Sequence, residues 1–134
     1  MKPISDSSFI CRMRSGSVYL SQMQFLPGYC ILSAEPVVKS INDLLPDAQS
    51  NFLLDMVRIG DAIIEVTDAY LINYALMGNS HPVLHAHIVP RYLWEPENLR
   101  KGLPWDHPNT HSETTRYDEK RDGELVDKIR NRLM

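Results

Sequence analysis

One stretch of the sequence decides the fold: Gly78-Asn-Ser-His-Pro-Val-Leu-His-Ala-His-Ile-Val-Pro-Arg91. It predicts a strand over 83–89, a run of apolar and histidine residues enclosed by Pro82 and Pro90. Proline cannot donate a hydrogen bond to a neighbouring strand, so each proline is expected to mark a strand end. The stretch also holds three of the five histidines, so strand and candidate site are predicted together.

The period of a strand assigns these side chains to two faces. Residues two apart point the same way, so His85 and His87 share one face, with Val83 beside them. The opposite face is apolar and is expected to meet the core; it consists of Leu84, Ala86 and Ile88. Two adjacent imidazoles on an otherwise apolar strand are costly unless each is hydrogen-bonded.

The segments around this strand predict an α+β fold with an antiparallel sheet. Further strands are expected over 17–21, 29–33 and 70–76, and helices over 46–66 and 118–133. The order is β, β, α, β, β, then an irregular segment over 93–117 and the last helix. A loop of that length in a small domain usually has a function, binds a partner or is mobile.

The longer helix has the clearest pattern. Its apolar residues recur at helical spacing and predict one core-facing stripe, made of Phe52, Met56, Ile59, Ile63 and Val66. Pro46 suits the first turn, where its missing N–H costs nothing. Leu45 before it is a poor cap. Gly60 inside the helix indicates close approach to a strand.

Composition bounds the class of protein. The chain has 134 residues, 43% of them hydrophobic, which suits one domain over 1–134 with a sizeable core. The net charge of −3 gives no basic field for DNA or RNA, so no nucleic-acid partner is expected. No apolar run reaches the roughly 20 residues that span a bilayer, and Met1–Phe9 has no apolar signal core, so a cytoplasmic location without membrane contact is expected. Cys11 and Cys30 are interpreted as reduced thiols.

The histidines alone leave three interpretations open. The pair His85 and His87 is structural, or it binds a metal with His107 and His111, or one imidazole is a nucleophile at phosphorus. The spacing of His107 and His111 around Pro108 speaks against a helical ligand pair. Arg91 is interpreted as solvated rather than bound to phosphate, and Trp94 and Trp105 as packing residues rather than base-stacking ones.

The flanks of the histidines resemble the histidine-triad (HIT) family of nucleotide hydrolases and transferases. The resemblance rests on Gly78-Asn79, Pro82, His85-x-His87 and Pro90-Arg91. Within the family, the segment is most similar to a bacterial branch that resembles diadenosine polyphosphate hydrolases. It covers about 17–92, where Phe25-Leu-Pro-Gly28, Asn42-Asp-Leu-Leu-Pro46 and Ile72-Asn-Tyr74 are also similar. The segment 93–134 fits loosely.

The resemblance implies a HIT-like fold, a homodimer and a nucleotide phosphohydrolase that needs no cofactor or metal. His85 matches the nucleophile that attacks the α-phosphorus, and His87 a histidine that orients the phosphate. Substrate-binding positions are Asn79 near the phosphate, Ser21 and Gln22 near the ribose, and His81. Diadenosine polyphosphates or nucleoside phosphoramidates would be the substrates, through a nucleotidyl-histidine intermediate.

Two positions depart from the family pattern. Val83 stands where the first triad histidine is expected, and Val37 where an upstream histidine often stands. The loss of a general acid typically slows a reaction 10²–10⁴-fold, so a nucleotide-binding protein with little turnover is the alternative. His81 is in phase with the missing histidine, but Pro82 and the turn argue against its replacing that group.

Overall fold

A five-stranded antiparallel sheet lies at the centre of the protein in the computed structural model, which describes residues 6–134. In sheet order the strands are β1 (Phe9–Met13), β2 (Gly16–Leu20), β3 (Cys30–Ala34), β5 (His85–Arg91) and β4 (Leu71–Leu76). The strand with the two histidines therefore lies inside the sheet, between β3 and β4. β1 and β4 form the two edges.

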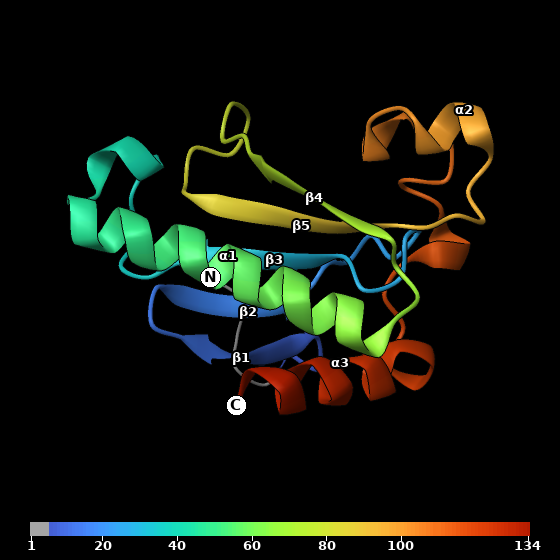
Figure 1. Ribbon diagram of the computed structural model, residues 1–134, viewed down its shortest axis with the longest axis horizontal. Coiled ribbons are helices and arrows are strands. Elements are labelled where there is room, and N and C mark those ends of the chain that lie inside the picture. Colours follow the sequence, from blue (N-terminus) through green and yellow to red (C-terminus); the bar gives the residue numbers. More distant parts are fainter. Residues whose placement is uncertain (1–5) are drawn as a thin grey trace.

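Two long helices pack on one face of this sheet. Helix α1 (Pro46–Val66) lies across β3, β5 and β4, and α3 (Glu119–Leu133) packs beside it and against β1 (Figure 1). The chain between β5 and α3 forms only short helical turns: α2 (Glu97–Arg100) and 3-10 turns at 104–106 and 113–115. The predicted α+β class, with an antiparallel sheet, a long central helix and a C-terminal helix, is confirmed.

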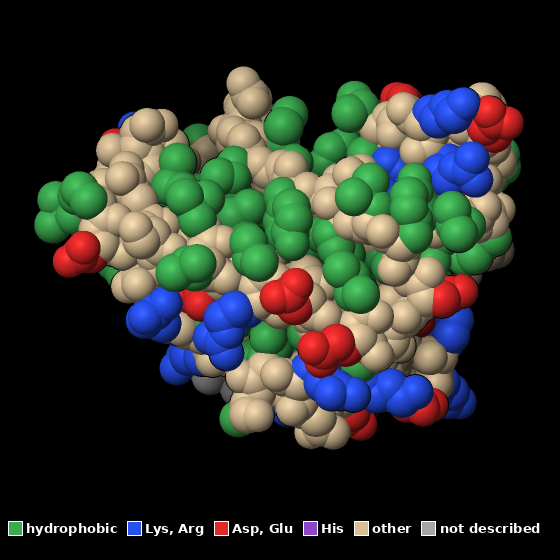
Figure 2. Space-filling model, in the orientation of Figure 1, with side chains coloured by type: hydrophobic (Ala, Val, Ile, Leu, Met, Phe, Trp, Pro, Cys, Tyr) green, Lys and Arg blue, Asp and Glu red, His purple; other side chains and the backbone are tan. Residues whose placement is uncertain are grey.

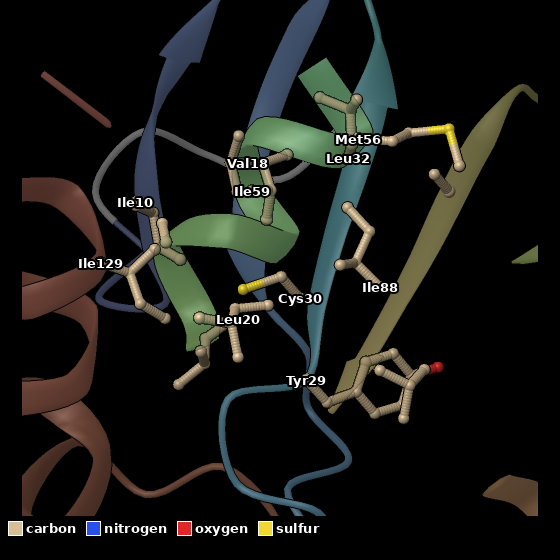
Figure 3. Close-up of a cluster of buried hydrophobic side chains, with 14 of the residues drawn as sticks. Ile10, Val18, Leu20, Tyr29, Cys30, Leu32, Met56, Ile59, Ile88 and Ile129 are labelled. Atoms are coloured by element: carbon tan, nitrogen blue, oxygen red, sulfur yellow. The ribbon is translucent and has the colours of Figure 1, made fainter. Parts of the chain in front are cut away.

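The core lies between the sheet and the two helices. β5 contributes the predicted apolar face: Ala86 and Ile88 are fully buried, and Leu84 is 6% exposed. Ile88 belongs to one buried cluster with side chains of β1, β2, β3, α1 and α3, several of which Figure 3 labels. The alternation of β5 therefore fixes which face of the sheet the helices cover and which face is left for the histidines.

The ends of the strands differ from the prediction. β1 was not expected, and β5 begins at His85 rather than at 83 and continues through Pro90 to Arg91. The last pair between β3 and β5 is Cys30 with Ile88, so Pro90 pairs with β4 alone. A proline is tolerated there because one side of the strand is free at that position.

Helix α1 follows its sequence closely. It begins at Pro46 after Leu45, whose side chain makes no capping hydrogen bond, as expected. Its predicted stripe is buried from Phe52 to Ile63. A methyl group at Gly60 would lie 2.1 Å from the hydroxyl oxygen of Tyr74, so the expected close approach to a strand is real.

Both cysteines, Cys11 and Cys30, are buried free thiols, and burial raises the pKa of each. Within residues 6–134, no helix is both long enough and apolar enough to cross a bilayer.

Arg91 is buried rather than solvated, which corrects the sequence-based interpretation. It is 2% exposed and forms a two-pronged ion pair with Glu95, at 2.9 and 3.2 Å. Its remaining N–H groups bind the side chain of Asn73 on β4 and the backbone carbonyls of Leu99 and Gly102. Arg91 therefore fastens the segment after β5 to the sheet. Its N–H groups are bound within the protein and are not available for phosphate.

Glu95 has a third partner at the same place. The side chain of His107 lies 2.7 Å from its Oε1 atom, and the backbone N–H of Tyr92 donates to Oε2 at 2.7 Å. Burial alone would raise the pKa of Glu95, but hydrogen bonds from Arg91, Tyr92 and His107 lower it below its usual value. The segment from 92 to 107 is thus folded around one buried carboxylate.

Replacing Arg91 with Met is expected to lower the free energy of unfolding by about 3–5 kcal/mol, because Glu95 would remain buried without its cation. Chemical denaturation measures this, and limited proteolysis should show faster cleavage within 93–117. The matched control is Lys101→Met, which removes the exposed ion pair with Glu97 and should cost less than about 1 kcal/mol. Equal losses in the two variants would contradict the anchoring role of Arg91.

Candidate active site

A cavity of about 660 Å³ opens on the sheet face that α1 does not cover. Its floor follows from strand register: Ser17 on β2 pairs with Ser33 on β3, which pairs with His85 on β5. The next row has the same order and consists of Tyr19, Ile31 and His87. The walls come from neighbouring segments and include Leu20–Met23, Ala34, Glu35, Val37, His81, Val83 and Leu84.

His85 presents a free ring nitrogen at this cavity. Its Nδ1 atom lies 2.8 Å from the backbone carbonyl oxygen of Val83. A carbonyl only accepts, so Nδ1 carries the hydrogen and the neutral ring has its lone pair on Nε2. No residue within 6–134 forms a hydrogen bond with Nε2. The backbone thus selects the tautomer that a nucleophilic imidazole requires.

His87 is held in the opposite tautomer. Its Nδ1 atom lies 2.7 Å from the hydroxyl oxygen of Tyr29. Burial raises the pKa of Tyr29 to about 12, so the phenol keeps its proton and donates it. Burial and the neighbouring His85 lower the pKa of His87 from 6.5 to about 4, so the ring is neutral at pH 7. Nδ1 therefore accepts, and Nε2 carries the hydrogen as a donor.

The two rings form part of a row of aromatic groups. The centroids of His85 and His87 are 4.8 Å apart in an edge-to-face arrangement, and Trp105 contacts His87 on the other side at 5.3 Å. His81 contacts His85 with a centroid distance of 5.7 Å. The site therefore offers one imidazole acceptor beside one imidazole donor, with a third imidazole at the exposed end of the row.

The structure brings most of the predicted site residues together. Ser21, Gln22, His81, His85 and His87 all line the cavity. Asn79 lies in the exposed turn before β5 and is not among the lining residues. Its contact with phosphate stays a prediction, as do the binding roles of the other residues.

The two remaining histidines lie elsewhere. His107 is buried against Phe25 and bonded to Glu95, and His111 is exposed. The structure therefore does not bring them to His85 and His87, as the metal-site interpretation required. Across residues 6–134, no group of three or more His, Cys, Asp or Glu side chains is arranged to hold a metal ion.

Sequence reasoning missed three residues of the site. Tyr29 was assigned to a buried strand, Trp105 to packing, and Glu35 was not considered. No local pattern identifies them. Glu35 lines the cavity from just after β3, whereas Tyr29 and Trp105 contact His87 from just before β3 and from the segment after β5. Glu35 accepts a hydrogen bond from Ser17 at 3.0 Å and lies 3.5 Å from the guanidinium of Arg12.

Solved structures match this arrangement along nearly the whole chain. A histidine triad (HIT) protein from Sinorhizobium meliloti superposes with a TM-score of 0.77 at 19% identity, over 93% of this chain and 88% of its own. A histidine triad protein from Marinobacter aquaeolei superposes with a TM-score of 0.72 at 20% sequence identity, over 95% of this chain and 90% of its own. A histidine triad protein from Bradyrhizobium japonicum superposes with a TM-score of 0.71 at 19% sequence identity, over 100% of this chain and 97% of its own.

The chain has the HIT-like fold. Sequence comparison alone does not reach this result, because no protein-family model and no curated protein matches the chain. The likeness confirms the fold that the motif around His85 implied. In the HIT-like fold of this chain, the two histidines of β5 lie at the cavity on the uncovered sheet face.

Replacing Tyr29 with Phe is expected to release His87 from its single tautomer, because Nδ1 loses its donor. Nitrogen-15 NMR of the histidine rings should show the Nε2–H form of His87 in the native protein and a mixture in the variant.

In the native protein His87 should titrate near pH 4. Since this pKa lies below 6.5, the unfolded chain binds the proton first, and stability should fall as pH drops from 6.5 towards 4.

Tyr70→Phe is the control, since Tyr70 is exposed and does not line the cavity. It should leave the His87 signals unchanged. The tautomer assignment is wrong if the native protein shows a hydrogen on Nδ1 of His87.

Proposed function

We propose that the protein is a nucleotide phosphohydrolase in which His85 attacks the α-phosphorus of a diadenosine polyphosphate or a nucleoside phosphoramidate. The observation that carries the proposal is the free Nε2 atom of His85 at the cavity, with its hydrogen fixed on Nδ1 by the carbonyl of Val83. A neutral imidazole with an oriented lone pair is a good nucleophile at neutral pH.

The neighbouring groups support this chemistry. Attack by Nε2 forms a P–N bond and makes the His85 ring cationic, and the Val83 carbonyl then accepts a hydrogen bond from a charged donor, which strengthens it. The Nε2–H of His87 is a donor beside the nucleophile and suits a non-bridging phosphate oxygen. The leaving group departs from phosphorus, and water then releases the nucleoside monophosphate and restores His85.

The charges of the cavity favour one of the two substrate classes. Among the described residues that line it, there is no Lys or Arg, and Glu35 is acidic. A chain of several phosphates would bring negative charges that no fixed cation matches. A phosphoramidate has a single phosphate anion, which neutral N–H donors hold. We therefore place nucleoside phosphoramidates before diadenosine polyphosphates.

A second candidate function rests on Val83. This side chain lines the cavity where the family pattern has a histidine, and it offers no proton to a leaving group. The candidate is a nucleotide-binding protein with little or no turnover. In that case nucleotide binds to the cavity, and no product accumulates.

The test is incubation with adenosine 5′-phosphoramidate and, separately, with a diadenosine polyphosphate, followed by chromatography for adenosine monophosphate. We expect release from the phosphoramidate and a loss of at least about 10³-fold in His85→Ala, because the nucleophile is gone. Acid-quenched mass spectrometry should detect a nucleotidyl adduct on His85 in the native protein.

His111→Ala is the matched control, since it removes an exposed imidazole that does not line the cavity. Its rate should equal that of the native protein. Full activity in His85→Ala would remove this residue from the mechanism. Nucleotide binding without any product from the native protein would establish the second candidate instead.

We also propose that two copies of the chain form a homodimer through α1 and β4. Figure 2 shows many apolar side chains gathered over α1 and beside it, with other side chains between them. Its exposed residues on α1 are Leu53, Leu54, Val57 and Ile64, and on and beside β4 they are Tyr70, Leu71, Tyr74 and Met77. β4 is an edge strand with one unpaired side. An apolar surface beside an open edge is typical of a protein interface.

Replacing both Leu54 and Val57 with Glu is expected to convert the dimer into a monomer, since each side chain is about half exposed on the outer face of α1. Analytical ultracentrifugation should give twice the chain mass of 15.4 kDa for the native protein and the single mass for the variant. Asn131→Glu places a negative charge on the exposed face of α3 instead and should leave the dimer intact. A native protein that sediments as a monomer would overturn this proposal.

A further inference from the structure

The turn before β5 brings His81 to a place that its sequence position does not suggest. On an extended strand, residues four apart are separated by roughly 13 Å. The ring centroids of His81 and His85 are only 5.7 Å apart. The chain must therefore double back between these two residues.

A tight turn at Pro82 produces this reversal. The backbone N–H of Val83 donates to the carbonyl of His81 at 2.8 Å, which closes a turn of three residues. Proline at the centre fixes its own backbone angle and favours such a turn. Gly78 precedes it with a φ of +83°, a backbone region that glycine adopts without strain. Pro82 and its turn, which in the sequence argue against His81 replacing the missing histidine, thus bring the ring of His81 beside that of His85.

The position that His81 reaches matters because of Val83. Val83 cannot transfer a proton, and His85 uses its own Nδ1–H for the carbonyl of Val83. His87 gives its Nδ1 to Tyr29 and keeps its hydrogen on Nε2 with a pKa of about 4, so it is a poor carrier of an extra proton. Of the three imidazoles in the row, His81 is the most exposed to solvent, from which it can reload a proton, whereas His85 and His87 are half-buried.

We infer that His81 is the general acid and base of the reaction at His85, in place of the imidazole that Val83 lacks. The inference rests on the proposed hydrolase function and adds a proton-transfer residue to it. His81 lines the same cavity as the nucleophile, and its ring is in edge-to-face contact with the ring of His85. A leaving group bound beside the phosphorus therefore meets His81 as it departs.

The proton balance closes over two steps. In the first, Nε2 of His85 forms a bond to phosphorus, the bond from phosphorus to the leaving nitrogen or oxygen breaks, and protonated His81 gives that atom a proton. In the second, neutral His81 takes a proton from water as the water oxygen bonds to phosphorus. The P–N bond to His85 then breaks, and the electron pair returns to Nε2. Both histidines end as they began.

The test compares two leaving groups in native protein and in His81→Ala. One substrate is an adenosine 5′-phosphoramidate of an alkylamine, which must be protonated to leave. The other is the p-nitrophenyl ester of adenosine monophosphate, whose phenolate leaves without a proton. The rate compared is that of the first step, measured in a single turnover as release of the amine or of nitrophenolate, because both substrates share the second step. We expect His81→Ala to slow this first step by about 10²–10⁴-fold with the amine substrate and by less than about tenfold with the nitrophenyl ester.

A purely structural role for His81 would affect both substrates alike. Equal slowing on the two substrates, or no slowing on the amine, would overturn the inference while leaving the proposed hydrolase intact. If the native protein reacts with neither substrate, the hydrolase proposal itself fails, and the inference fails with it. His111→Ala again serves as the control, with native rates expected on both substrates.

A second variant separates loss of the acid from loss of the turn. His81→Ala combined with Val83→His puts an imidazole just before β5, two residues from His85, at the position of the valine. Recovery of at least about tenfold on the amine substrate, relative to His81→Ala, supports proton transfer as the lost step. Thermal unfolding of His81→Ala should match that of the native protein, since the side chain of His81 is exposed.

Discussion

The constraint on which the rest of the structure depends is the register of β5. This strand lies inside the sheet, and its alternate residues are committed to opposite environments. Ala86 and Ile88 are fully buried under the helices, while His85 and His87 face the cavity. A shift of one residue would place two imidazoles in the core and expose the apolar residues. The free energy of core packing therefore also holds the site residues in position.

Within that register, two hydrogen bonds give chemically equivalent side chains different roles. His85 donates from Nδ1 to a backbone carbonyl, and His87 accepts at Nδ1 from a phenol. Consequently, Nε2 of His85 has a lone pair, and Nε2 of the neighbouring His87 has a hydrogen. No charged residue is needed for this difference, which suits a cavity whose described lining contains no Lys or Arg. Contacts within the protein therefore set the donor and the acceptor of the pair.

The buried cluster of Arg91, Glu95 and His107 connects the site to the segment that follows β5. Arg91 is the last residue of the strand that bears the histidines, and its partners lie at 73, 95, 99 and 102. The cluster fixes the path of the chain up to Trp105, which packs against His87. The first part of the irregular segment, 92–107, is therefore folded around one guanidinium and one carboxylate.

The sequence by itself determined the elements that local periodicity controls. The stripe of α1, the apolar face of β5, the close approach at Gly60 and the α+β order follow from residue spacing alone. The pairing of His85 with His87 on one face also follows, because a strand has a period of two. The motif around these histidines further implied the HIT-like fold, although the overall identity to solved relatives is only about 19%.

The tertiary structure decided what depends on residues distant in sequence. Burial of Arg91 required Glu95 and two carbonyls of a later segment, and the tautomer of His87 required Tyr29 from another strand. The position of His81 depended on the direction of a three-residue turn, and Pro82 alone predicts a turn but not where its ends point. The residue pattern of the sequence thus determined which side chains the candidate site contains. Tertiary packing determined where their lone pairs and protons point.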